Sequence, residues 1–183
     1  MRTFVIFLAV ILVALVGYPY VHSILPQSGA GSQISTLIQG NLVSAAGSPF
    51  SFPANAGSIQ YYAIYYSAQW CPPCHAFTPV LVEWYKKFKP SHPNFELIFV
   101  SDDHDHASML AYMQEMAMPW PAFQFDELKH DGKGIEKFAG AGIPDLVLVD
   151  ADGKVLSDSF SWAGSYLGPQ HVLDDIEKLV GGT

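Results

Sequence analysis

Two cysteines are the residues of this sequence best suited to chemistry, and they are the only cysteines among its 183 residues. Cys71 and Cys74 lie in the run Trp70-Cys71-Pro72-Pro73-Cys74. An aromatic-rich apolar run over residues 61–66 precedes them and predicts a buried strand, and a segment of helical period follows. A thiol at the start of a helix faces unpaired N–H groups and the positive end of the helix dipole, which lowers its pKa. The second thiol, one turn deeper, can close a disulfide with the first, so the pair is predicted to be a reversible dithiol.

A structural disulfide is the alternative explanation for the same pair. Structural bridges stabilise a protein mainly by closing a long loop in the unfolded chain. A bridge from Cys71 to Cys74 spans only Pro72 and Pro73 and closes almost no loop. Chemistry therefore explains the pair better than stability does.

The elements that must position these thiols alternate between strand and helix. After Cys74, apolar residues recur at helical spacing as far as Phe88, with Pro79 expected to bend the helix. Residues 95–101 predict a strand, and a strand, helix, strand order calls for a parallel crossover. Further predicted elements are a hairpin within residues 41–52, helices over 107–116 and 135–138, a hairpin joining 146–149 to 154–157, and a helix over 169–180.

The N-terminal segment is interpreted as a targeting signal. Residues 1–3 carry the charge and residues 4–16 are apolar, a run of helix roughly 20 Å long that is too short for a ~30 Å hydrocarbon layer. We predict a signal peptide over residues 1–23, with a short membrane anchor through residues 4–16 as the alternative. A linker over residues 24–40 and one domain over 41–183 follow. Either interpretation places the domain outside the cytoplasm, as a periplasmic or secreted protein.

Composition limits the partners of the domain. The formal net charge is −8, and the sequence contains no cluster of Lys and Arg. Because phosphate binding needs a basic face, nucleic acid is excluded as a predicted partner.

Four motifs, in this order, make the chain resemble a known family. They are Tyr65-Tyr66-Ser67-Ala68-Gln69-Trp70-Cys71-Pro72-Pro73-Cys74, Phe77-Thr78-Pro79, Phe99-Val100-Ser101-Asp102 and Met118-Pro119-Trp120. Together with an Ile-Pro before the second hairpin, they resemble the tryparedoxin and nucleoredoxin branch of the thioredoxin-like superfamily. The resemblance implies an α/β thioredoxin fold, with a central mixed sheet flanked by helices and here an N-terminal hairpin extension.

The resemblance also implies a role for each matching residue. Cys71 is expected to be the exposed nucleophile that attacks a substrate disulfide, and Cys74 the buried thiol that resolves the mixed disulfide. Pro144, after Ile143, matches a cis-proline whose loop faces the cysteines. Trp70, Pro72, Pro73, Ile143 and Pro144 are expected to shape the site. The expected partners are protein thiols or disulfides and a recharging redox protein, membrane-bound if the domain is exported. The Cys71–Cys74 pair serves without a further cofactor.

Three residues near the motif are candidates for tuning the thiol pKa values. Tyr65 stands where many thioredoxins carry a buried acid, so the deprotonation of Cys74 must rely on water or another group. Asp145 follows Pro144 where the family often has Thr; it is expected either to oppose the Cys71 thiolate or to point outward, with the outward position favoured. His75, four residues after Cys71, can share its helix face and stabilise its thiolate when protonated.

A haem protein is the main alternative function, because Cys71-Pro72-Pro73-Cys74-His75 also satisfies the c-type haem attachment pattern. His75 would then be one axial ligand and a methionine the second, the candidates being Met109, Met113, Met116 and Met118. A β-forming run before the motif and a complete α/β pattern after it argue against haem. A thioredoxin-fold binding module without turnover is a third possibility.

No metal site is predicted. Cys71 and Cys74 alone would leave zinc two ligands short. His104 and His106, among three aspartates in residues 102–106, could bind a metal if the loop converged, but a solvated charged loop is the favoured interpretation.

Overall fold

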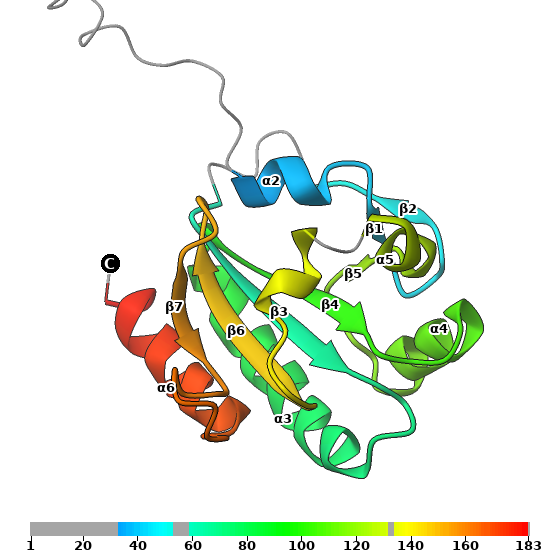
Figure 1. Cartoon of the computed structure of the whole chain (residues 1–183). Helices are drawn as coiled ribbons and strands as arrows, with labels where there is room; N and C mark the ends of the chain where they lie inside the picture. Colours follow the sequence, from blue (N-terminus) through cyan, green and yellow to red (C-terminus); the bar gives the residue numbers. More distant parts are fainter. Residues whose placement is uncertain (1–32, 53–58, 132–133, 183) are drawn as a thin grey trace, which may run out of the picture. The chain divides into compact units, whose positions relative to one another are not determined.

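A computed structural model describes residues 33–52, 59–131 and 134–182 (Figure 1). The strands are β1 (Leu42–Val43), β2 (Pro49–Phe50), β3 (Tyr61–Ser67), β4 (Phe95–Ser101), β5 (Ala122–Phe123), β6 (Asp145–Asp150) and β7 (Val155–Asp158). The α-helices are α2 (Gln33–Ile38), α3 (Pro72–Phe88), α4 (His106–Glu115), α5 (Phe125–Asp131) and α6 (Pro169–Leu179). Two 3₁₀ helices are also present, η1 (Lys89–Ser91) and η3 (Glu136–Phe138). Within the described ranges, no helix combines the length and the apolar character that crossing a membrane requires.

The strands form one mixed sheet in the order β2-β1-β5-β4-β3-β6-β7. β3 and β4 pair in parallel along their full lengths, and β6 pairs antiparallel with β3. Ser67 therefore lies opposite Ser101, and Tyr66 lies opposite Asp145. Because of this register, the ends of β3 and β4 and the start of β6 meet at one edge of the sheet. The segments that follow β3 and β4 and the one that precedes β6 must build any site at that edge.

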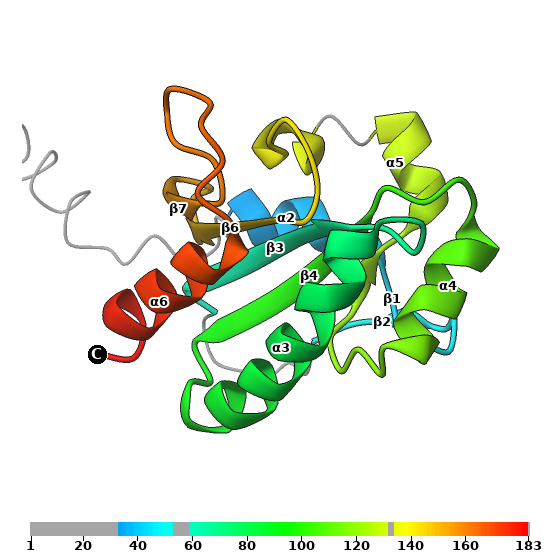
Figure 2. The ribbon, with the colours of Figure 1, turned by 90° about the horizontal axis from the view of Figure 1, so that it is seen from below.

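Helices cover both faces of the sheet (Figures 1 and 2). On one face, buried residues of α3, α4 and α6 pack against β3, β4 and β6 in a single large cluster. On the other face, α2 and η3 bury apolar side chains against the same strands. β3 and β4 are therefore buried on both sides, which explains why their sequences are nearly continuous apolar runs.

Most predicted elements are confirmed. The N-terminal hairpin is β1 and β2 at the edge of the sheet, the strand-helix-strand crossover is parallel, and the second hairpin is β6 and β7. α3 continues through Pro79 from Pro72 to Phe88. β5 and α5 were not predicted. β5 has only two residues, and its pairing with β4 joins residues distant in sequence.

The domain begins earlier than the predicted residue 41. α2 falls in the predicted linker, yet its Ile34 and Ile38 are 1% and 4% exposed and pack in the second cluster. A helix of six residues is not stable alone, so tertiary burial holds it. Residues 33–40 are thus part of the folded domain. The rest of the predicted linker and the predicted signal peptide, residues 1–32, lie outside the described residues.

We expect Ile34→Ala to lower the free energy of unfolding by about 2–5 kcal/mol, because it removes buried methyl groups and leaves a cavity under α2. Urea denaturation of the full chain measures this. Thr36→Ala, at an exposed position of the same helix, controls for helix propensity and should change the stability far less. Equal effects of the two substitutions would contradict the packing of α2 on the sheet.

Candidate active site

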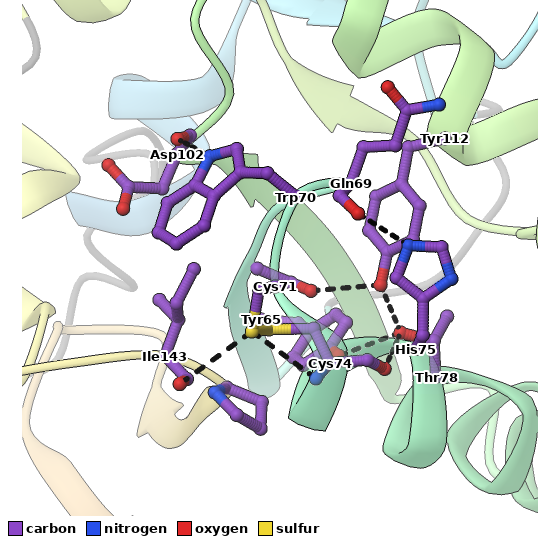
Figure 3. Close-up of a disulfide and its surroundings, with 12 residues drawn as sticks. Tyr65, Gln69, Trp70, Cys71, Cys74, His75, Thr78, Asp102, Tyr112 and Ile143 are labelled. Atoms are coloured by element: carbon purple, nitrogen blue, oxygen red, sulfur yellow. Dashed lines mark hydrogen bonds between the residues drawn. A yellow bond between two sulfur atoms is a disulfide. The ribbon is translucent and has the colours of Figure 1, made fainter.

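The two cysteines lie where β3 leads into α3, and they are joined in a disulfide with their Cα atoms 5.2 Å apart (Figure 3). Cys71 has extended backbone angles and is the N-cap of α3, and its Sγ accepts a hydrogen bond from the Cys74 N–H over 3.3 Å. Pro72 and Pro73 occupy the first helical positions, where a missing N–H costs nothing. The predicted placement of the first thiol at a helix N-terminus is confirmed.

Both cysteines are buried, which corrects one expectation. Cys71 is 3% exposed and Cys74 is fully buried, whereas Cys71 was predicted to be exposed. The two pack with Ala68, and Ile143 packs against that cluster. The Sγ of Cys71 lies 3.8 Å from the Ile143 carbonyl oxygen. The segment before β6 therefore shields Cys71, a contact between residues 72 positions apart.

The loop before β6 faces the disulfide as the resemblance implied. The Ile143–Pro144 peptide bond is cis, and we call residues 140–144 the Pro144 loop. Trp70 flanks the disulfide on the same side as Ile143 (Figure 3) and is half exposed, so it is not a plain core aromatic. Its indole N–H donates to the Asp102 carbonyl at 3.0 Å, and its ring stacks on His104. These contacts tie the active-site turn to the loop after β4.

The side chains of the loop after β4 have structural roles. Asp103 is buried; its carboxylate accepts hydrogen bonds from the Gln69 N–H at 2.8 Å and the Ser101 hydroxyl at 2.8 Å. Asp105 caps α4 by accepting from the Ser108 N–H, which lowers the pKa of its carboxyl. Among the described residues, no three His, Cys, Asp or Glu side chains gather as a metal site would require. The loop thus braces the cysteine turn, a role that composition alone did not indicate.

A cluster of four hydroxyl groups lies behind Cys74, and it was not predicted from the sequence. The Thr78 hydroxyl donates to the Cys74 carbonyl at 2.8 Å and shares hydrogen bonds with the hydroxyls of Tyr65, at 2.8 Å, and Tyr112, at 2.7 Å. The Tyr112 hydroxyl also lies 3.1 Å from the Ser67 hydroxyl. Burial raises the pKa of Tyr65. Neutral hydroxyls therefore occupy the place of the acid that many thioredoxins carry.

One signal of this cluster was present in the sequence. Tyr65 and Ser67 are two residues apart on β3 and so lie on the same face of the strand. Thr78 lies one turn after Cys74 on α3. The contribution of Tyr112 from α4 carried no such signal, because only the packing of α4 on the sheet brings it to Thr78.

Asp145 does not point outward, which corrects the favoured expectation. It is fully buried, and its Oδ2 accepts a hydrogen bond from the Gly140 N–H at 2.7 Å. Because it lies opposite Tyr66 in an antiparallel pair, its side chain is on the face of β3 away from Tyr65 and α3. Burial, reinforced by the nearby charge of Asp158, raises the pKa of Asp145 to about 6. The carboxylate holds the Pro144 loop rather than facing Cys71 directly.

His75 lies on the first turn of α3, but its contacts differ from those predicted. Its Nε2 forms a hydrogen bond with the Gln69 carbonyl, and its ring lies 5.1 Å from that of Tyr112 (Figure 3). These contacts hold the imidazole beside the hydroxyl cluster. The suggested stabilisation of the Cys71 thiolate by His75 stays a prediction.

The geometry defines a class of protein: a dithiol carrier on a thioredoxin fold. The sulfur that caps α3 gains from helix N–H groups when ionised, and its partner is one turn away within bonding distance. A family model described as thioredoxin-like matches residues 58–155. The chain belongs to the thioredoxin-like family.

Similar proteins place the chain near nucleoredoxins and tryparedoxins. It is 39% identical to human nucleoredoxin over 97 residues, which are 53% of this chain and 22% of that protein. It is 38% identical to tryparedoxin of Trypanosoma brucei brucei over 89 residues, which are 49% of this chain and 60% of that protein. Tryparedoxin I from Leishmania major has a similar structure, with a TM-score of 0.60 and 28% identity over 81% of this chain and 96% of that one. The chain thus spans about a fifth of the nucleoredoxin that it matches.

The comparisons contradict the predicted export. The relatives, nucleoredoxins and tryparedoxins, are cytoplasmic or nuclear proteins and are not exported. The prediction of a periplasmic or secreted protein is therefore wrong. That prediction depended only on the charge and hydropathy of residues 1–23.

Asp145 gives stability a pH dependence whose sign follows from its pKa. Because the pKa is about 6 in the folded chain against 3.8 for a free carboxyl, the folded chain binds the proton more strongly. That stabilisation is present in acid and is lost as the pH rises through about 6. We expect Asp145→Asn to gain up to about 3 kcal/mol relative to wild type between pH 4 and pH 7. Urea denaturation at a series of pH values measures the difference.

Asp152→Asn, at an exposed position of the turn between β6 and β7, is the matched control for that series. It should run parallel to wild type across the pH range. A wild-type curve parallel to that of Asp145→Asn would show that the buried carboxyl titrates as an ordinary one.

Proposed function

We propose that the protein is a thiol-disulfide oxidoreductase that exchanges disulfides with protein substrates through Cys71 and Cys74. The observation that carries this proposal is the disulfide at the N-terminus of α3, with the Pro144 loop against it. The similarity to nucleoredoxins and tryparedoxins, which are thiol-disulfide oxidoreductases, supports it.

The reaction begins with reduced protein and an oxidised substrate. The Cys71 thiolate attacks one sulfur of the substrate disulfide, a mixed disulfide forms, and the other substrate sulfur leaves with the electron pair of the broken bond. The Cys71 sulfur is the attacking atom because Cys71 is the N-cap of α3. The Cys74 N–H, which donates a hydrogen bond to this sulfur in the disulfide form, is placed to stabilise the thiolate. Cys74 then attacks Cys71, which releases the second substrate thiol and leaves the disulfide.

The second step requires Cys74 to lose its proton in a fully buried position. The hydroxyl cluster of Ser67, Tyr65, Thr78 and Tyr112 carries no charge, so it offers hydrogen bonds but no strong base. The thiolate of the substrate that left in the first step is a stronger base than these hydroxyls. We propose that it accepts the Cys74 proton, since it is released next to the site.

The protein is proposed to act as a reductant. A strongly oxidising pair requires a stabilised thiolate in the reduced form. The described side chains that contact the cysteine turn supply hydroxyls, an indole, an imidazole and the Asp103 carboxylate, and none is Lys or Arg. Stabilisation therefore comes mainly from the helix N-terminus. A dithiol donor must reduce the Cys71–Cys74 disulfide again after each reaction. The prediction that this donor is membrane-bound depended on export, which the comparisons contradict.

The haem alternative is not favoured by the geometry. Thioether attachment would use both sulfurs, which here bond to each other, and the His75 Nε2 is engaged by the Gln69 carbonyl. Met109 and Met113 of α4 are fully buried in the hydrophobic core. An absorbance spectrum of purified protein separates the two functions, since covalent haem gives an intense Soret band and a dithiol protein has none.

We expect Cys71→Ser to abolish insulin reduction with dithiothreitol as the electron source, and to form no mixed disulfide with insulin. Cys74→Ser is the matched control, because it also lacks the internal disulfide but keeps the attacking thiol. It should turn over poorly and accumulate the mixed disulfide, which mass spectrometry of the intact protein detects. Trapping by Cys71→Ser in place of Cys74→Ser would reverse the two roles, and wild type without turnover would favour a binding module.

We expect the Cys71–Cys74 pair to have a reduction potential near or below roughly −250 mV, in the range of reductants, because no Lys or Arg among the described side chains contacts the cysteine turn. Equilibration with glutathione buffers of known ratio, followed by alkylation and mass spectrometry, measures it. A potential near the ~−120 mV of strong oxidants would instead show a disulfide donor.

A further inference from the structure

The segment between β7 and α6 projects as a long loop (Figure 2) and lies beyond the residues that the family model matches. Phe160 and Tyr166 form an antiparallel bridge within it. Between them, the Ser161 N–H donates to the Ser165 carbonyl at 2.8 Å and the Gly164 N–H donates to the Ser161 carbonyl at 2.8 Å. We call residues 160–166 the 160s hairpin. Its backbone bonds give it a defined shape rather than that of a loose connection.

The 160s hairpin contacts the Pro144 loop at two points. The Tyr166 hydroxyl donates a hydrogen bond to the Pro144 carbonyl at 2.9 Å. Phe160 packs so closely on Gly140 that a Cβ at residue 140 would overlap its ring. The two rings of the hairpin also lie 5.0 Å apart, so the Phe160 contact and the Tyr166 hydrogen bond belong to one unit.

Burial does not explain Tyr166. Its side chain is half exposed, and a residue placed for packing alone needs no hydroxyl. The hydroxyl instead fixes the carbonyl of Pro144. The carbonyl oxygen of the preceding residue, Ile143, lies 3.8 Å from the Cys71 sulfur. At the other end of the loop, the Asp145 carboxylate accepts a hydrogen bond from the Gly140 N–H. The Pro144 loop is thus held at its first residue by Asp145 and Phe160 and at its last by Tyr166.

We propose that Tyr166 is a positioning residue that holds the Pro144 loop ready for protein disulfides and so favours them over small disulfides. This inference rests on the proposed function. An extended substrate that lies along the Pro144 loop binds more weakly if the loop must first be ordered, since the ordering entropy is then lost on binding. A small disulfide needs only the sulfur of Cys71. Tyr166 therefore affects the binding of the first kind of substrate and not the chemistry of either.

The test is Tyr166→Phe in the full chain, which keeps the ring on Phe160 and removes only the hydroxyl. For fluorescein-labelled insulin with dithiothreitol as donor, we expect KM to rise about twofold to tenfold, the loss of one hydrogen bond, with kcat unchanged. For 5,5′-dithiobis(2-nitrobenzoic acid), the second-order rate constant of the pre-reduced protein should stay as in wild type. Tyr61→Phe, at the far end of β3 from the cysteines, should change neither reaction.

Each other result overturns the inference. An unchanged KM for insulin shows that the hydroxyl does not position the loop. A parallel loss with both substrates, or a fall in kcat alone, shows a general structural role. Failure of the proposed function is distinguishable, because wild type would then not turn over insulin, whereas failure of this inference leaves wild type turning over insulin and Tyr166→Phe with the same KM.

Discussion

The cap of α3 by a cysteine is the interaction on which the site depends. Pro72 and Pro73 carry no N–H, so the amide of Cys74 is the first hydrogen-bond donor at the start of the helix. That donor points to the sulfur of Cys71. The same geometry that begins the helix therefore sets the electrostatics of the Cys71 sulfur. The second sulfur follows within one turn, because the donor and the second thiol belong to the same residue.

Register brings the rest of the site to this cap. The parallel pairing of β3 with β4 and the antiparallel pairing of β3 with β6 place three connecting segments at one edge of the sheet. One carries the cysteines, one braces them through Asp103 and the Asp102 carbonyl, and one presents Ile143 to the disulfide. A shift of one residue in the pairing of β3 with β6 would put Asp145 on the opposite face of the sheet from Tyr66.

The distribution of charge around the cysteines also follows from the packing of the sheet. Behind Cys74 the core supplies neutral hydroxyls, among them those of Tyr65 and Thr78. One of the two buried carboxyls near the site, Asp145, lies on the other face, where it binds the Pro144 loop. The acid therefore acts on the shape of the substrate-facing loop rather than on the proton of Cys74. This division separates loop geometry from thiol chemistry.

The sequence by itself determined the long strands, the crossover helix and the reactive pair, because those depend on local periodicity and on spacing within one turn. Its resemblance to a family also predicted the cis-proline. Only the tertiary structure decided that α2 belongs to the domain and that Asp145 is buried. It also decided that Tyr166 reaches Pro144 and that Tyr112 reaches Thr78. These contacts join residues 22 and 34 positions apart. Distant contacts of this kind depend on strand register and helix packing, which leave no periodic signal in the chain.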